Sequence, residues 1–156
     1  MSQRAEELAS QFEQVHDQLV NTIQPMSEQQ WASATHEEGW TAGAAAHHAV
    51  IAAEPLSGFI RAAAAGEPLP PITPEQLNEI NRQHAEAFAD VSKDEVVAEV
   101  NKNVPPTAAL LRSLTDDELD KQAETPFGGP MTTEQIIRNV LIGHVQQHLA
   151  SVHGAG

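Results

Sequence analysis

The sequence predicts an all-α protein organised as a four-helix bundle. Apolar residues recur every three or four positions over long stretches, which is the periodicity of an amphipathic helix. Alternation of apolar and polar residues, the mark of a strand, never lasts more than a few positions. No internal repeat of about 20 to 50 residues is visible. A chain of 156 residues suits one domain, so residues 1–156 are expected to form a single bundle.

The first helix is expected from about Ser2 to Ile23, with Pro25 ending it. Its apolar positions are separated by four, three, four and four residues, as in a bundle seam: Leu8, Phe12, Val15, Leu19 and Ile23. The second long helix is Ala-rich, begins at residues 39–41 and ends near Ala65. Pro55 should kink it, because proline removes a backbone donor and clashes with the preceding turn.

Capping boxes indicate where further segments begin: Ser27 with Gln30, Thr73 with Gln76, Ser92 with Glu95, and Thr132 with Gln135. The first begins a short turn that carries Trp31, and the second begins a helix that ends near Asp90. The third helix should reach about Leu114, with a break or kink at Pro105-Pro106. A polar connection with turn residues at 125–130 precedes the last helix. The long connections allow a topology other than simple up-and-down.

Composition excludes several classes of function. Acidic residues outnumber basic ones 22 to 8, and no cluster of Lys and Arg offers a nucleic-acid surface. The chain has no cysteine, so any sulfur chemistry would need an external thiol. The amino terminus lacks a signal-like apolar core, and no stretch approaches the roughly 20 apolar residues of a membrane span. We therefore expect a cytoplasmic protein that binds neither nucleic acid nor membrane.

His144 and His148 are the most informative residues. They are four residues apart in the last apolar segment, so on a helix both imidazoles share one face. At about 100° per residue, Ile137 and Leu141 fall within about 60° of His144, which places the pair on the core-facing side. A bundle interior is where facing helices build metal sites. The spacing alone is weak evidence, and the alternative is two solvated or core-satisfied histidines.

A third imidazole is available on the second helix. Thr41, Ala44 and Ile51 share the face of His48, whereas His47 points about 100° away. Small alanines around His48 leave room for a metal and a ligand, although Ala also suits close helix packing. We therefore expect His48 to be the third ligand, with His47 as the fallback.

Three neutral imidazoles without a fourth protein ligand are typical of an open catalytic site, where water or substrate completes the coordination. Imidazole suits Zn, Ni, Fe and Cu, and we favour Zn or Ni. Four polar side chains are candidates to orient the ligand rings, with no single one favoured: Glu54, Gln147, Asn81 and His84. The other histidines lack a helical partner at metal spacing and are expected at the surface or locally satisfied: His16, His36, His84 and His153.

Residues 39–41 (Gly-Trp-Thr), His48 eight positions after Trp40, and the His144-x-x-x-His148 pair together resemble the DinB/YfiT-like superfamily of metalloenzymes over nearly the whole chain. The resemblance implies a four-helix bundle of unusual connectivity, with His48, His144 and His148 as the metal ligands and homodimers as a common assembly. Several branches are thiol S-transferases that use bacillithiol or mycothiol, and one includes the mycothiol-dependent maleylpyruvate isomerases. That branch carries glutamate where this chain has His144 and adds a carboxy-terminal domain absent here, so the isomerase activity itself is in doubt.

The leading hypothesis is a divalent-metal enzyme that transfers a low-molecular-weight, mycothiol-like thiol to a small electrophile. One alternative is a metal-dependent hydrolase of a small ester or amide, and another is a bundle that binds metal or ligand without turnover. Trp40 could wall the metal pocket or serve as a packing anchor. Arg82 could hold a carboxylate of substrate or thiol, or form surface ion pairs with Glu79 or Glu86.

Overall fold

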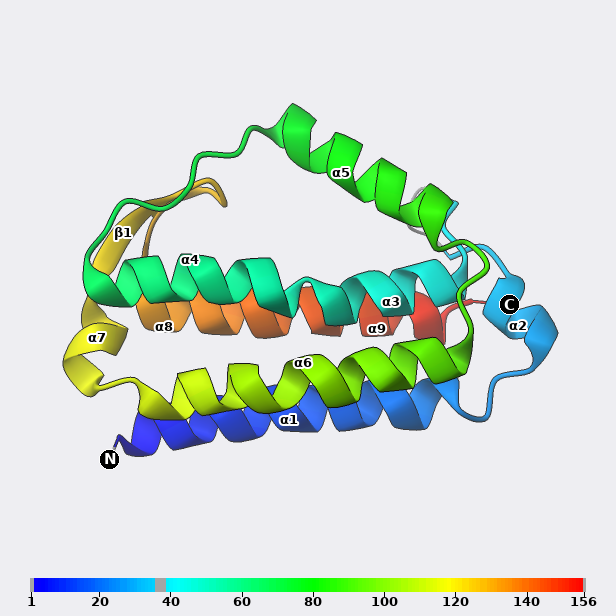
Figure 1. Cartoon of the computed structure of the whole chain (residues 1–156), viewed down its shortest axis with the longest axis horizontal. Helices are drawn as coiled ribbons and strands as arrows, with labels where there is room; N and C mark the ends of the chain where they lie inside the picture. Colours follow the sequence, from blue (N-terminus) through cyan, green and yellow to red (C-terminus); the bar gives the residue numbers. More distant parts are fainter. Residues whose placement is uncertain (1, 36–38, 156) are drawn as a thin grey trace.

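The computed structural model describes residues 2–35 and 39–155 and has the expected four-helix bundle (Figure 1). Its four columns are α1 (Gln3–Ile23), α3 with α4 (Ala42–Ile51 and Ala53–Ala65), α6 (Lys93–Ser113), and α8 (Thr133–Gln135) continued by the π-helix η1 (Ile136–Ile142) and α9 (Gly143–His153). Shorter elements join them: α2 (Glu28–Ala32), α5 (Pro74–Ala87), α7 (Asp116–Asp120), and the strands β1 (Gln122–Thr125) and β2 (Gly129–Thr132). Within the described ranges, no helix combines the length and apolar character needed to cross a bilayer.

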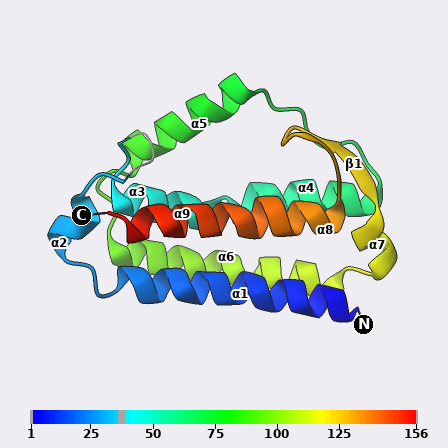
Figure 2. The same ribbon diagram turned by 180° about the vertical axis from the view of Figure 1, so that it is seen from behind.

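The connectivity of the bundle is not simple up-and-down. Both ribbon views show α1 beside α6, and the α3–α4 column beside the column that ends in α9 (Figures 1 and 2). The α3–α4 column and α6 follow each other in the chain but run in the same direction. The chain must therefore return along the length of the molecule between them. Residues 66–73 and α5 make this return outside the bundle, and α5 stands off from α4 (Figure 1).

The core lies along the predicted seam of α1. Leu8, Phe12 and Leu19 are each 0% exposed, so the spacing of the first helix is confirmed. At one end of the bundle Trp31 is buried, and its indole nitrogen donates a hydrogen bond to the carbonyl oxygen of Val91 at 2.7 Å. Gly43 lets this ring approach α3, because a Cβ on Gly43 would lie 2.9 Å from Trp31 Cε2.

The two proline predictions have different outcomes. The helix that contains Pro55 is interrupted at Ala52, between α3 and α4, as the missing N–H requires. By contrast, α6 continues through Pro105 and Pro106, so of the expected break or kink the break does not occur. Both prolines are exposed, and the carbonyls they leave unpaired belong to residues 101 and 102, which face water. Solvation of those groups lets the helix continue.

Two features have no counterpart in the sequence-based expectations. The turn at 125–130 joins an antiparallel hairpin in which Gln122 pairs with Thr132, where only a connection was expected. Gly128 and Gly129 have positive φ angles, which glycine adopts without strain and which the tight turn requires. The last helix also widens into the π-helix η1, and Gly143 N–H donates to the carbonyl oxygen of Arg138, five residues earlier.

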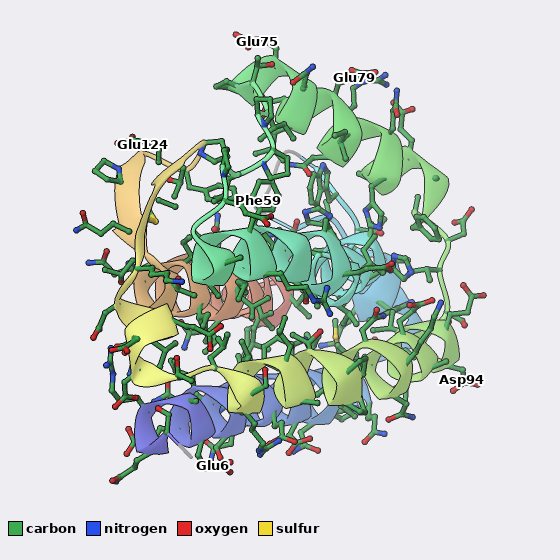
Figure 3. The ribbon with its side chains drawn as sticks, turned by 60° about the vertical axis from the view of Figure 1, so that its left-hand side comes forward. Glu6, Phe59, Glu75, Glu79, Asp94 and Glu124 are labelled. Carbon is green, nitrogen blue, oxygen red and sulfur yellow. The ribbon has the colours of Figure 1, made fainter. Side chains whose placement is uncertain are left out.

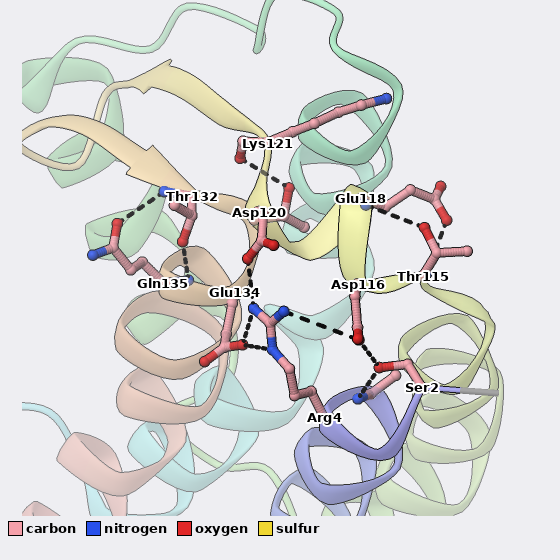
Figure 4. A network of polar contacts seen from close by, with 12 residues as sticks. Ser2, Arg4, Thr115, Asp116, Glu118, Asp120, Lys121, Thr132, Glu134 and Gln135 are labelled. Carbon is pink, nitrogen blue, oxygen red and sulfur yellow. Dashed lines mark hydrogen bonds and ion pairs between the residues drawn. The ribbon is translucent and has the colours of Figure 1, made fainter.

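A polar network fastens the start of α1 to the connection that precedes the last helix (Figure 4). Arg4 lies between Asp120 and Glu134, with guanidinium nitrogens 2.7 Å from a carboxylate oxygen of each. Ser2 caps α1 and donates a hydrogen bond to Asp116 at the start of α7. These contacts hold α7 and the hairpin against the end of the bundle opposite to Trp31.

Candidate metal centre

His48, His144 and His148 converge between α3 and α9. Their candidate ligand nitrogens all lie within 4.8 Å of one another, and the Nε2 atoms of His144 and His148 are 3.0 Å apart. Three nitrogens held by one ion at about 2.0–2.1 Å in a tetrahedral arrangement would be about 3.3 Å apart. Small side-chain rotations therefore suffice to place all three around one ion. Three neutral nitrogen donors suit a borderline divalent metal such as Zn or Ni.

Burial favours the neutral form of His48 and His148. His48 is 9% exposed and His148 is 6% exposed. Loss of hydration lowers the pKa of His48 to about 2, with a further contribution from the neighbouring histidines, and lowers the pKa of His148 to about 4. The Nδ1 atom of His48 is buried and has no hydrogen-bond partner within the described residues. A neutral imidazole is the form of histidine that binds a metal, so a set of three histidine side chains fits one.

Trp40 forms one wall of the centre. Its ring meets the edge of His48 with 5.3 Å between centroids and stacks on His148 at 6.0 Å. The adjacent Thr41 caps α3 by accepting a hydrogen bond from the backbone N–H of Ala44. The residues that begin the helix thus also cover two of the three imidazoles. Trp40 is also partly buried against the core, as expected for a packing anchor, and its role at a metal pocket stays a prediction.

His47 lies outside the three-histidine cluster. Its Nδ1 is 2.8 Å from Nε2 of His84, and its ring stacks on Phe88 with 4.1 Å between centroids. The two adjacent rings have different neighbours, in line with the angular argument, and the choice of His48 as the ligand stays a prediction. The three-histidine cluster in the structure contains His48 and does not include His47.

His84 carried two expectations, one as a candidate to orient the ligand rings and one as a surface or locally satisfied residue. It is 8% exposed, its ring lies 5.0 Å from that of His48, and burial lowers its pKa to about 4. The expectation that it lies at the surface is wrong. The available signal was its position seven residues after Leu77, on the face of α5 that carries apolar residues.

The remaining histidines have different environments. His16 is also buried, at 1% exposure, and its Nδ1 is 2.9 Å from the carbonyl oxygen of Phe12. A surface position for His16 is therefore wrong, although it does make a local contact. His153 is exposed as expected, and His36 lies outside the described residues.

An apolar cavity of about 390 Å³ opens beside the cluster, between α5 and the bundle. His48 and His144 contribute to its wall, and aromatic and aliphatic side chains of α4, α5 and the hairpin contribute most of the rest. Figure 3 shows Phe59 on the side of α4 that faces α5. A second cavity of about 540 Å³ shares His144, Val140 and Phe127 with the first. A small molecule could therefore reach the imidazoles along an apolar path.

The other polar side chains singled out in the sequence lie apart from the cluster or at the edge of a cavity. Arg82 is half exposed and forms ion pairs with Glu79 and Glu86 at 2.6 Å each. These are the surface ion pairs that were expected as the alternative to substrate binding. Glu54 is exposed, and Gln147 is exposed at the rim of the second cavity. Asn81 and His84, by contrast, both line the first cavity.

Comparison with known proteins supports the four-helix-bundle fold. Residues 11–152 match the family model of the DinB superfamily. Among solved structures, the mycothiol-dependent maleylpyruvate isomerase aligns with a TM-score of 0.73 at 18% identity, covering 99% of this chain and 64% of that one. YfiT from Bacillus subtilis, described as "a probable metal-dependent hydrolase with an unusual four-helix bundle topology", aligns with a TM-score of 0.75 at 18% identity, covering 97% of this chain and 86% of that one.

An uncharacterised protein from Clostridium difficile 630 aligns with a TM-score of 0.67 at 15% identity, covering 97% of this chain and 95% of that one. No match was found among curated protein sequences. The chain spans just under two thirds of the isomerase, and identities this low establish a shared fold rather than a shared reaction.

Proposed function

The chain belongs to the DinB superfamily, and on that premise we propose that it is a metal-dependent enzyme that transfers a low-molecular-weight, mycothiol-like thiol to a small electrophile. His48, His144 and His148 would hold the metal, with Zn or Ni the favoured ions. The observation that carries the proposal is the convergence of three imidazoles beside an apolar cavity whose wall includes His48 and His144. A structural site would be expected to close its coordination with a fourth protein ligand, which this cluster lacks among the described residues.

Each part of the cavity has a role in this reaction. A divalent metal bound by the cluster would lower the pKa of a thiol and favour the thiolate form, which is the nucleophile. The chain has no cysteine, so the thiol must come from solution and no internal thiol competes for the site. Trp40 covers His48 and His148, and the apolar walls exclude water from the region where thiol and electrophile meet.

The relatives supply reasons to test this reaction and its main rival. The isomerase is mycothiol-dependent by its description, which favours an external thiol as cosubstrate. The description of YfiT favours a hydrolase, in which water would take the place of the thiol. Cytoplasmic location, a homodimeric assembly and a single domain over residues 1–156 remain predictions.

Thiol dependence separates the alternatives. Protein purified without chelators is assayed with monochlorobimane as electrophile and mycothiol, bacillithiol or N-acetylcysteine as thiol, and in parallel with 4-nitrophenyl acetate alone. We expect consumption of the electrophile only when a thiol is present, and loss of this activity in His48→Ala. Turnover of the ester without thiol would support the hydrolase instead. Bound metal with neither activity would support a non-catalytic binding bundle.

A further inference from the structure

One face of α5 closes the cavity, and this face is not uniformly apolar. The cavity-lining residues of α5 are three or four positions apart or adjacent, so they share a side of the helix: Leu77, Ile80, Asn81 and His84. Glu79 lies on the outer side, away from the bundle (Figure 3), where it binds Arg82. The return segment of the fold therefore presents two polar side chains, one helical turn apart, to the space beside His48.

Both of these polar side chains have an atom that no described residue satisfies. Oδ1 of Asn81 and Nδ1 of His84 are buried, and neither has a hydrogen-bond partner among residues 2–35 and 39–155. His84 is 8% exposed, and its other nitrogen, Nε2, is already engaged by Nδ1 of His47 at 2.8 Å. This contact fixes the orientation of the His84 ring and leaves Nδ1 on the side away from His47. A buried polar atom without a partner destabilises a protein, so its retention at a cavity wall needs a reason.

The chemistry of the wall indicates what would satisfy these atoms. An amide oxygen such as Oδ1 of Asn81 accepts a hydrogen bond, so the missing group is an N–H or O–H donor. Nδ1 of His84 donates or accepts according to the tautomer that His47 selects. No Lys or Arg is among the described residues that line this cavity, so a carboxylate or phosphate placed there would lack a protein cation. The complementary group is neutral and contains a donor.

We propose that Asn81 and His84 form an anchoring site for a neutral amide group of the ligand that fills this cavity. The N–H of that amide donates to Oδ1 of Asn81, the polar end of the ligand lies beside His84, and its apolar part packs on Leu77 and Ile80. Because the ring of His84 lies 5.0 Å from that of His48, the amide sits close to the reacting end of the ligand. The inference rests on the proposed function only in placing that reacting end at the histidine cluster.

A matched pair of small thiols tests the proposal. N-acetylcysteamine carries the amide, and 2-mercaptoethyl acetate has the same length but an ester oxygen in place of the N–H. Dissociation constants are measured by calorimetry on the metal-loaded protein. We expect the amide to bind about tenfold more tightly than the ester, as one hydrogen bond to a buried acceptor allows. Asn81→Leu should abolish this preference by weakening only the amide, and Asn78→Leu, at an exposed position of the same helix, should retain it.

Stability distinguishes an anchoring role from a structural one. If Oδ1 of Asn81 awaits a ligand, Asn81→Leu should raise the melting temperature of the ligand-free protein, because it removes an unpaired buried acceptor. Asn81→Ala gives a second variant with less added volume. Equal binding of amide and ester by the unaltered protein, or no binding of either, overturns the proposal, as does a lower melting temperature in both variants. Metal content is measured on the same samples: preference for the amide without bound metal would refute the proposed function while supporting the anchoring site.

Discussion

The two pairs of helices in the bundle differ in what they bury. Along α1 and α6 the buried side chains are mostly aliphatic or aromatic, and Phe12, Leu19 and Leu111 are each 0% exposed. Between α3, α5 and α9 the buried groups include four imidazoles: His47, His48, His84 and His148. Most of the groups that the first pair buries are apolar and contribute hydrophobic free energy, His16 being an exception. The second set includes buried nitrogens of His48 and His84 that have no hydrogen-bond partner among the described residues. This difference indicates that one half of the molecule stabilises the fold and the other is shaped for a ligand.

Removal of a metal ligand should have the largest effect on the histidine-rich half. We expect His148→Ala to reduce bound metal from about one ion per chain to nearly none, because two imidazoles hold a divalent ion far less tightly than three. Helicity should be almost unchanged, since alanine favours a helix. Metal analysis and far-ultraviolet circular dichroism measure the two quantities. His153→Ala, at an exposed position, is the matched control; full metal occupancy in His148→Ala would contradict the assignment.

Truncation of a buried apolar side chain of α1 or α6, the apolar half of the bundle, should lower stability and leave metal binding unchanged. Phe12→Ala removes a fully buried ring, and we expect a loss of about 3–5 kcal/mol in the free energy of unfolding, measured by urea denaturation. The folded fraction should bind as much metal as the unaltered protein, because Phe12 lies on α1 and the three histidines of the cluster lie on α3 and α9. Loss of metal from a variant that is still folded would show that the two halves are not separable in this way.

His16 places a titratable group within the apolar half, and stability there should depend on pH. Burial lowers the pKa of His16 below the unfolded value of 6.5. Below pH 6.5 the imidazole is therefore protonated in the unfolded chain while it stays neutral in the folded protein. Stability is therefore complete above pH 6.5 and is lost as the pH falls, by at most about 1.4 kcal/mol per pH unit. Urea denaturation of the protein and of His16→Leu at several pH values should show a shallower dependence in the variant. The same pH dependence of stability in both proteins would contradict this role of His16.

Arg82 should have the smallest effect of the four. Its guanidinium forms ion pairs with Glu79 and Glu86 at the outer side of α5, and exposed ion pairs contribute little to stability. Arg82→Ala should leave metal content, thiol-dependent activity and the preference for an amide thiol unchanged in the assays described above. A large loss of thiol-dependent activity in Arg82→Ala would instead support a substrate-binding role for Arg82.

The sequence predicts the parts of this structure that depend on local interactions. The boxes at Ser27, Thr73 and Thr132 are confirmed, because a cap is satisfied by residues three positions away. The histidine pair is also set by local structure. His144 and His148 both lie within α9, so residues four apart still share one face of the helix, although the preceding turns form the π-helix η1.

Features set by distant contacts could not be predicted in this way. Nothing in residues 74–87 distinguishes a bundle helix from one that returns outside the bundle, since both have an apolar face. The burial of His84 follows from that return path and from its contact with His47, 37 residues away. The π-helix likewise depends on how the last column packs, and helix-forming residues give no local sign of a wider turn.

Anomalous X-ray scattering from crystals of chelator-free protein tests the central claim most directly. A shared metal centre predicts one strong anomalous peak at about 2.0–2.2 Å from a nitrogen of each of His48, His144 and His148, with at least one coordination position left for water or a ligand. The absence of a peak, with the three imidazoles bonded only to protein groups or water, would contradict it.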